Sequence, residues 1–208
     1  MPKIVDPEER RKAVVDAVFR VVRRDGVEAA SLRNIAGEAG LAIGSVRHYF
    51  TSHEELMVFA MKEMVERVSA RVLAHVEALR RPAPVRDRAA RAEALLREFL
   101  PADDERFDET VVWLEFVIAA RTRPSLQPEA KRLHDGMRMI VGKVLSEGDR
   151  NGRLRPGLDL DAETERLAAL LDGLAMAAVL QPWSFTPQSA LDVLHDHLAT
   201  LTVEGLAL

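Results

Sequence analysis

The chain has 208 residues, enough for one large domain or two small ones with a buried core. Hydrophobic residues make up 48% and charged residues 30%, as in an ordinary soluble globular protein, and the lack of cysteine excludes disulfides and thiolate metal sites. The net charge is −4, but residues 1–81 carry +2 and the remainder −6, so charge alone neither favours nor opposes binding to nucleic acid.

No stretch of the sequence predicts insertion into a membrane. The first thirty residues lack the continuous apolar segment after a basic start that marks a signal peptide. The longest apolar run, from Leu174 to Leu180, is too short to span a bilayer. We therefore expect a cytoplasmic protein with no membrane partner.

The N-terminal region predicts a short arm followed by a helix. Residues 1–7 are polar and contain two prolines, which favours a mobile arm. From about residue 8 to residue 24, apolar residues recur once per turn and predict one buried face, and Asp25 and Gly26 end the helix. This face consists of Ala13, Val14, Ala17, Val18, Val21 and Val22.

The residues from Ser31 to Phe50, SLRNIAGEAGLAIGSVRHYF, predict two short helices joined by a tight turn. Ser31 is an N-cap residue, and Gly40 supplies the left-handed conformation that ends the first helix. The pattern is typical of a helix-turn-helix motif, whose second helix enters the major groove of DNA. A helical hairpin in an ordinary bundle is the alternative. The second helix would leave four side chains outside: Ser45, Arg47, His48 and Tyr49.

A long helix follows the motif. Ser52 and Glu55 have the spacing of a capping box, and the helix can run without a break from residue 53 to residue 81, before Pro82 and Pro84. It is long enough to connect two domains. We therefore predict a DNA-binding domain over residues 1–52 and a second domain over residues 53–208, with residues 53–81 as the connecting helix.

The second domain is predicted to be helical throughout, with helices near residues 85–99, 105–122, 126–148, 161–181 and 187–202. Asp161 is the expected N-cap of the fourth of these helices, and Thr186 with Pro187 begins the fifth. Asn151 and Gly152 indicate a turn after the third. No strand pattern and no internal repeat is visible, so the predicted fold class is all-α.

The segment GVEAASLRNIAGEAGLAIGSVRHYFTSHEEL resembles the DNA-binding region of the tetracycline-repressor (TetR) family of bacterial transcriptional regulators. The resemblance covers roughly residues 8 to 60. It implies an N-terminal three-helix helix-turn-helix domain joined by a long helix to a C-terminal helical ligand-binding and dimerisation domain. Three positions depart from the family pattern. Ala42 replaces a capping serine or threonine, Arg47 stands where an aromatic residue is common, and His53 replaces a lysine that usually contacts a phosphate.

The motif and its flanks hold the predicted DNA contacts. Arg47 can donate to O6 and N7 of a guanine, the commonest specific contact. Better placed for phosphates are Ser31, Arg33, Tyr49 and His53. Gly44 has no side chain where the second helix must approach the duplex. Taken singly, each of these is more simply a solvated surface residue, but the motif favours DNA contact. The predicted DNA-binding residues are Ser31, Arg33, Gly44, Ser45, Arg47, His48, Tyr49 and His53.

Apolar residues on the helices 105–122 and 126–148 form a further candidate site. Such residues more often belong to a core, but the resemblance implies an apolar cavity for a small-molecule effector within these helices. Arg121, His134 and Arg138 are the polar groups that would orient the effector. The predicted effector-binding residues are Phe99, Trp113, Phe116, Val117, His134, Met137 and Arg138.

The last two helices carry a further apolar set. They could complete the core of the chain, but the resemblance implies a four-helix bundle between two copies of it. The predicted dimer-interface residues are Leu167, Leu170, Leu174, Ala178, Leu191, Leu194 and Leu198.

No constellation in the sequence indicates catalysis. His195 and His197 point apart on a helix and cannot share a metal ion, and no phosphate-binding loop or nucleophile motif is present. We expect no cofactor, no metal and no enzymatic activity. The predicted function is a ligand-responsive repressor that binds a palindromic DNA operator as a homodimer and is released by a small apolar effector. The alternatives are a DNA-binding regulator without an effector, or a helical enzyme or adaptor that does not bind DNA.

Overall fold

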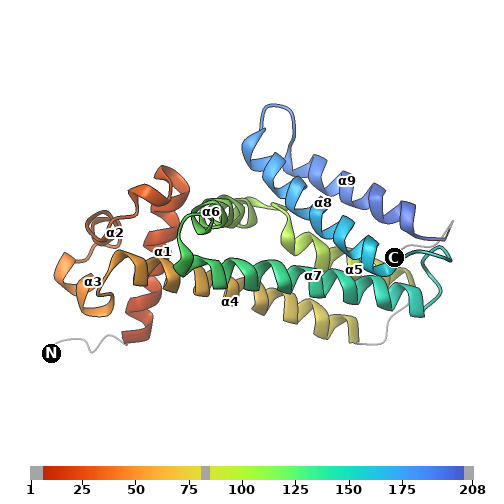
Figure 1. Cartoon of the computed structure of the whole chain (residues 1–208), viewed down its shortest axis with the longest axis horizontal. Coiled ribbons are helices and arrows are strands. Elements are labelled where there is room, and N and C mark those ends of the chain that lie inside the picture. Colours follow the sequence, from red (N-terminus) through yellow and green to blue (C-terminus); the bar gives the residue numbers. More distant parts are fainter. Residues whose placement is uncertain (1–6, 81–84, 204–208) are drawn as a thin grey trace. The chain divides into compact units, whose positions relative to one another are not determined.

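The computed structural model describes the backbone of residues 7–80 and 85–203, and the side chains of residues 10–78 and 90–203 (Figure 1). The described chain is helical, apart from one isolated β-bridge between Leu154 and Thr202. The all-α prediction is confirmed. The helices are α1 (Pro7–Asp25), α2 (Leu32–Glu38), α3 (Ile43–Tyr49), α4 (His53–Arg80), α5 (Val85–Leu96), α6 (Asp104–Ala120), α7 (Gln127–Arg150), α8 (Leu160–Leu180) and α9 (Pro187–Leu201), with 3-10 turns η1 (Val27–Ala29), η2 (Arg97–Phe99) and η3 (Pro124–Leu126).

The chain divides into two compact units. The first unit comprises residues 1–66 and 111–131, and the second comprises residues 67–110 and 132–208. The division therefore falls inside α4, α6 and α7, whereas the predicted domain boundary lies at residue 52. The predicted arm over residues 1–7 and the predicted turn at Pro82 and Pro84 lie outside the described residues, except for Pro7 at the start of α1.

The core of the first unit is built on the valine-rich face of α1. Val14, Val18 and Val21 are buried, as the periodic pattern predicts, and α1 contacts both η1 and α2. Ala13, which the pattern also placed on this face, is exposed. Arg20 Nε and Arg24 Nη1 also donate to the two carboxylate oxygens of Glu38 at 2.7 and 3.0 Å, which ties the end of α2 to α1. α2 in turn contacts α3. These contacts fix the helix-turn-helix pair as one piece.

The turn between α2 and α3 forms as the sequence predicts. Ser31 Oγ accepts from the backbone N–H of Asn34 at 3.2 Å, so the predicted N-cap is confirmed. Gly40 has φ +65°, and the N–H of Leu41 donates to the carbonyl of Ala36 at 2.9 Å, which closes the end of α2. Ala42 precedes α3 without any side-chain cap, as its methyl group requires.

The start of α4 differs from the predicted capping box in one half. Ser52 Oγ accepts from the N–H of Glu55 at 3.1 Å, as expected. The Glu55 carboxylate, however, accepts from the N–H and hydroxyl of Thr51, at 2.8 and 2.7 Å, and no hydrogen bond to Ser52 N is described. These two bonds hold the pKa of Glu55 below its ordinary value.

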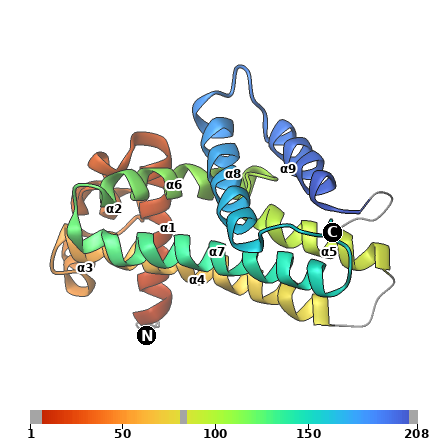
Figure 2. The same ribbon diagram turned by 45° about the vertical axis from the view of Figure 1, so that its right-hand side comes forward.

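α8 and α9 run side by side in the second unit, in both views of the ribbon (Figures 1 and 2). Thr186 caps α9, with Pro187 in its first turn, as predicted. The prediction that Asp161 caps α8 is wrong. Asp159 is the N-cap residue, and its carboxylate accepts from the N–H groups of Asp161 and Ala162, both at 3.1 Å.

A buried carboxylate organises the charged residues of the second unit. Glu98 on η2 exposes 4% of its side chain and binds Arg71 on α4 and Arg106 on α6. Arg71 Nε lies 2.9 Å from Glu98 Oε2, and Arg106 Nη2 lies 2.6 Å from Glu98 Oε1. His75 Nε2 is 3.0 Å from Oε1, and Arg71 also donates to both oxygens of Glu109. We call these five residues the Glu98 cluster.

The Glu98 carboxylate stays charged in spite of its burial. Burial raises the pKa of Glu98, but the hydrogen bonds from Arg106 and Arg71 outweigh it, so the pKa lies below its ordinary value. The cluster therefore connects α4, η2 and α6 through ionised groups.

Candidate nucleic-acid interface

The exposed face of α3 has the composition of a surface that reads DNA. Val46 is fully buried, whereas Ser45, Arg47 and His48 are exposed around it, so α3 is fixed by one side and open on the other. The rings of His48 and Tyr49 meet edge to face with centroids 5.2 Å apart. Gly44 is exposed, and a Cβ atom there would meet nothing within 4 Å. This backbone can therefore come close to another molecule.

Ile43 is a member of this face that the sequence analysis missed. It exposes 38% of its surface, although it is a large apolar residue, and it lies one helical turn before Arg47. An apolar side chain at this position can contact the methyl group of a thymine. Its position four residues before Arg47 was the signal in the sequence.

The start of α2 supplies the flanking polar groups. Arg33 is exposed, and no ion pair to it occurs among the residues that the structure describes. Ser31 is also exposed, but its oxygen already accepts from Asn34 N, which leaves its hydroxyl proton for an outside acceptor. Both positions suit phosphate contacts that fix the register of a helix in the groove.

His53, unlike Ser31 and Arg33, is not an exposed residue. It is half-buried at the first residue of α4, and its ring bonds to the backbone of Ala30. Burial and the positive charge of Arg123 lower the pKa of His53. The imidazole is therefore neutral at neutral pH, which argues against the predicted contact with a phosphate because only the imidazolium neutralises one.

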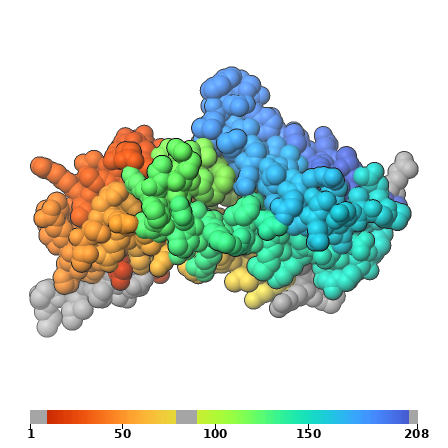
Figure 3. Space-filling model, viewed as in Figure 1, coloured from red at the N-terminus to blue at the C-terminus, as the bar shows by residue number. Residues whose placement is uncertain are grey.

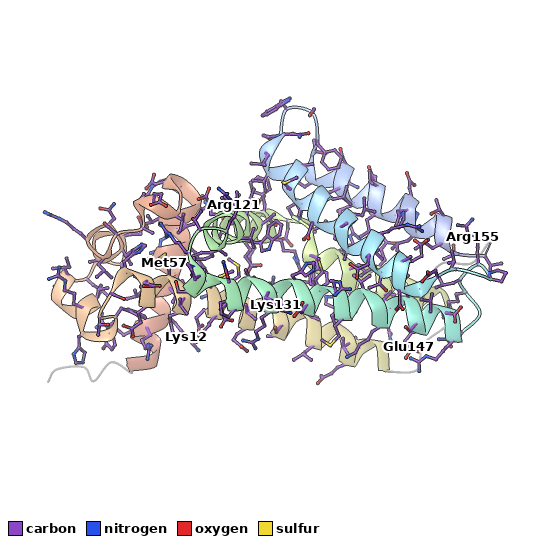
Figure 4. All side chains as sticks on the ribbon, viewed as in Figure 1. Lys12, Met57, Arg121, Lys131, Glu147 and Arg155 are labelled. Atoms are coloured by element: carbon purple, nitrogen blue, oxygen red, sulfur yellow. The ribbon has the colours of Figure 1, made fainter. Side chains whose placement is uncertain are left out.

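An open pocket of about 410 Å³ lies beside His53 within the first unit. Met57, labelled in Figure 4, forms part of its wall, and Arg123 stands at it with its guanidinium 2.6 Å from a Glu28 carboxylate oxygen. The pocket thus connects the start of α4 with the turn between α6 and α7. Its lining consists of His53, Glu54, Met57, Thr122, Arg123, Pro124, Ser125 and Leu126.

The predicted effector-binding residues are distributed over both units. Trp113 and Val117 are half-buried and Phe116 is fully buried in the first unit. In the second unit, Phe99 is half-buried, Met137 is buried and His134 is exposed, and Arg138 Nε donates to Glu165 at 3.2 Å. Phe116 thus has the burial of a core residue. The effector site stays a prediction.

Asp172 on α8 is a further titratable group that no local pattern indicated. It is half-buried, and burial raises the pKa of its carboxyl group. The charge of His134 acts in the opposite direction. Of Asp172 and His134, only His134 was among the residues that the sequence indicated.

Two family models match the chain. One, described as bacterial regulatory proteins of the tetR family, matches residues 14–58. The other, described as the C-terminal part of a BetI-type transcriptional repressor, matches residues 88–203. The chain belongs to the TetR family of bacterial transcriptional regulators.

Individual TetR-family relatives resemble the chain over nearly its whole length. It is 36% identical over 206 residues to the HTH-type transcriptional regulator PksA of Bacillus subtilis (strain 168), covering 98% of this chain and 95% of that protein. It is 27% identical over 202 residues to the HTH-type transcriptional regulator BetI of Rhizobium meliloti (strain 1021), covering 95% and 92%. A crystal structure of a transcriptional regulator from Saccharomonospora viridis in complex with choline is 23% identical, has a TM-score of 0.82 and covers 95% of this chain and 99% of that one. At this identity, the likeness shows the shared fold.

Membership of the TetR family makes the protein a DNA-binding transcriptional regulator and not an enzyme. In the part of the chain that the structure describes, no helix has the length and apolar character needed to cross a membrane. The same residues contain no group of three or more metal-ligating side chains.

The predicted dimer-interface residues lie on the inner faces of α8 and α9. Six of the seven are buried in the core of the chain itself, and Leu170 is half-buried. The six buried residues are covered by the chain itself, and the predicted interface stays a prediction. The apolar pattern identified a covered face but not what covers it, because packing within one chain and packing between two chains select the same residues. The buried six are Leu167, Leu174, Ala178, Leu191, Leu194 and Leu198.

Other apolar residues of the same TetR-family helices are exposed. Met176 and Leu180 expose 46% and 49% on α8, Trp183 exposes 81% in the turn that follows, and Val193 exposes 37% on α9. Figure 3 shows this turn standing out from the surface of the second unit. These four residues form the exposed apolar set of α8 and α9.

Proposed function

We propose that the protein represses transcription by binding a palindromic DNA operator as a homodimer and that a small apolar effector releases it. The exposed polar face of α3, fixed from behind by Val46, carries this proposal. Residues 1–52 would form the DNA-binding domain. Within it, Arg47 reads a base, Ile43 meets a thymine methyl group, and Arg33 holds the phosphate backbone.

The sharpest test of operator recognition is selection of bound sequences from random double-stranded DNA. A two-fold dimer with one recognition helix per subunit should enrich a palindrome whose half-sites are about one helical turn apart, or a multiple of that. Enrichment of a single unrepeated half-site would contradict the dimer, and no enrichment of any sequence would contradict operator recognition.

The dimer is proposed to form through the outer faces of α8 and α9. Met176 and Leu180 lie on one exposed side of α8, and exposed Ala169 and Gly173 on the same side let another helix approach closely. Substitution of an apolar side chain at a two-fold interface acts twice. A Met176→Glu variant should therefore sediment as a folded monomer and lose operator affinity.

Met139→Glu is the matched control for this variant. Met139 exposes 54% of its surface on α7, close to the 46% of Met176, but lies outside the exposed apolar set of α8 and α9. It should leave the sedimentation coefficient unchanged. Dimers of unchanged affinity in Met176→Glu would remove this interface, and monomers in both variants would place the interface elsewhere.

The effector is proposed to act by binding one conformation of the dimer more tightly than another. Tight binding alone shifts nothing, so the effector must distinguish the form whose recognition helices fit two successive major grooves from the form whose helices do not. A true effector should then raise the melting temperature and weaken operator binding together. If every compound that raises the melting temperature leaves operator binding unchanged, the regulator without an effector is the better interpretation.

Trp113 offers a direct probe of the effector site. In a Trp183→Phe background it is the sole tryptophan, and its fluorescence should change when the effector binds. Phe116→Ala is a poor test, because Phe116 is fully buried and its truncation would destabilise the fold by about 3–5 kcal/mol. Val117→Ala, at a half-buried position, is the gentler variant.

A further inference from the structure

The turn before the helix-turn-helix is held by a residue 88 positions away in the sequence. The N–H of Val27, the first residue of η1, donates to Glu115 Oε2 on α6 at 3.0 Å. Gly26 precedes it as the N-cap residue and has no side chain to accept this bond. The Glu115 carboxylate thus takes the place of the missing cap, because an amide at the start of a helix needs an acceptor from elsewhere.

The geometry around Gly26 brings the two segments close together. Gly26 has φ +81°, a conformation that glycine adopts without steric cost. A Cβ atom at this position would lie 3.5 Å from Glu115 Oε2. The side chain of Val27 is itself buried, so Val27 is held both by the packing of its side chain and by the hydrogen bond from its N–H to Glu115. The hydrogen bond therefore joins two segments of the first unit that are distant in the sequence.

A second contact joins the neighbouring residue of η1 to Arg123, which lies between α6 and η3. Arg123 Nη2 lies 2.6 Å from Glu28 Oε1. The Glu28 side chain is 85% exposed and that of Arg123 29%, so this ion pair contributes little to stability by itself. It links η1 to the segment between α6 and η3 at a second point.

η1 is in turn joined to the start of α2. Asn34 Nδ2 on α2 donates to the carbonyl of Ala29 at 2.8 Å, and the N–H of Ser31 donates to the same carbonyl at 2.8 Å. Ser31 also caps α2 through its hydroxyl. A displacement of η1 would therefore carry the first turn of α2 with it.

We propose that Glu115 and Arg123 are positioning residues for DNA binding, which hold η1 and thereby set the orientation of the helix-turn-helix without touching DNA. The proposal rests on operator recognition as proposed above.

The test compares Glu115→Ala with Glu105→Ala, which removes an exposed carboxylate from the same helix without a described contact to η1. Glu115→Ala should weaken binding to the selected operator by about tenfold, because the fraction of protein in the binding-competent orientation falls. Glu105→Ala should bind as the wild type does. Glu115→Gln keeps an oxygen acceptor for Val27 N–H and should restore most of the affinity.

The salt dependence of binding separates positioning from direct contact. Loss of a phosphate contact lowers the slope of log affinity against log salt concentration by about 0.9 for each contact. Glu115→Ala should keep the wild-type slope and the wild-type base preferences at every operator position. Wild-type affinity in a folded Glu115→Ala variant, or a changed slope, overturns the proposal.

Two further measurements cover failure of the first variant. If Glu115→Ala does not fold, Arg123→Ala, Glu28→Ala and the double variant replace it. The double variant should then bind no more weakly than either single one, and additive losses or no loss overturn the proposal.

If the wild type selects no DNA, operator recognition fails, and amide hydrogen exchange of residues 27–35 tests the contact itself. Exchange should be faster in Glu115→Ala than in Glu105→Ala, and equal exchange overturns the proposal.

Discussion

The exposed face of α3 and the Glu98 cluster both contain arginine, but the two regions satisfy it differently. Arg71 and Arg106 find their carboxylates inside the second unit, at 2.9 and 2.6 Å from Glu98. Arg47 and Arg33 are exposed, and neither has an ion pair within the described residues. An arginine that is paired within the chain holds the fold. An arginine that the chain positions but does not pair is available to a phosphate or a base.

This difference predicts opposite effects of mutation. Loss of the Glu98 carboxylate removes the one buried acceptor that Arg71 and Arg106 share. Each guanidinium then keeps only its second described partner, Glu109 for Arg71 and Asp103 for Arg106, so stability should fall. Loss of a guanidinium on the exposed face removes nothing that the fold uses, so DNA binding should fall and stability should not. The following experiments separate the two kinds of arginine.

Glu98→Gln should have the largest effect on stability, lowering the free energy of unfolding by about 3 kcal/mol. For a chain of this size, the melting temperature should fall by roughly 6–12 °C in thermal unfolding followed by circular dichroism. Glu147→Gln is the matched control. Glu147, labelled in Figure 4, pairs with Arg150 on the surface of α7 with a side chain 62% exposed, so its loss should cost at most about 0.5 kcal/mol. Equal losses in the two variants would contradict a special role for the cluster.

The Glu98 cluster should also govern stability toward acid. Because the pKa of Glu98 is lowered in the folded protein, its contribution is complete above the pKa of the unfolded chain and is lost as the pH falls through the folded value. The difference in melting temperature between the wild type and Glu98→Gln should therefore shrink as the pH is lowered below about 4.5. A constant difference would show that the carboxylate is not ionised in the fold.

Arg47→Ala should have the largest effect on sequence preference. A bidentate contact between arginine and guanine gives roughly 1–3 kcal/mol of discrimination against the wrong base. The variant should lose this preference at one symmetric pair of operator positions, measured with a panel of single-base substitutions, while its melting temperature stays that of the wild type. An Arg47→Ala variant that keeps the full base preference and changes only in salt dependence would make Arg47 a phosphate contact.

Arg33→Ala should act more weakly and without regard to sequence. Phosphates carry no base information, so its affinity for every operator variant should fall by the same factor. The salt slope should decrease by about 0.9 for each subunit. The measurement is titration of operator and unrelated DNA at two salt concentrations. A loss confined to a single operator sequence would show that Arg33 reads a base.

The sequence predicted the elements of this fold well because the boundaries carry local signals. Gly40 ends α2 and Thr186 with Pro187 begins α9 as expected, since a left-handed glycine and an N-cap act on their own neighbours. Asp159 was missed in favour of Asp161 because both are aspartates near the start of α8 and local chemistry does not distinguish them.

Contacts between distant segments were beyond the sequence analysis. Leu174 and Leu194 have the apolar periodicity of an interface, but a helical pattern does not say whether the chain covers its own apolar face. The bond from Val27 to Glu115 spans 88 positions and leaves no mark near either residue. The family resemblance suggested a phosphate for His53, and the partner that lowers its pKa, Arg123, comes from another part of the chain.

The smallest expected effect concerns the pH dependence that His53 confers on the first unit. Its pKa is lowered by burial and by Arg123, against the opposing charges of Glu28 and Glu54, so the folded protein binds a proton there less readily than the unfolded chain. The contribution of a neutral His53 to stability is therefore complete above the ordinary histidine value of about 6.5 and is lost as the pH falls toward the folded pKa. In His53→Gln this loss should be absent, so the wild type should lose more melting temperature than the variant between pH 7.5 and 5.5. Operator affinity can be compared in the same two proteins over the same pH range. Both keep His48, so any difference in how their affinity changes with pH comes from His53. If wild-type binding instead strengthens relative to His53→Gln as the pH falls, the imidazolium contacts a phosphate, and His53 belongs with Arg33 on the outer surface.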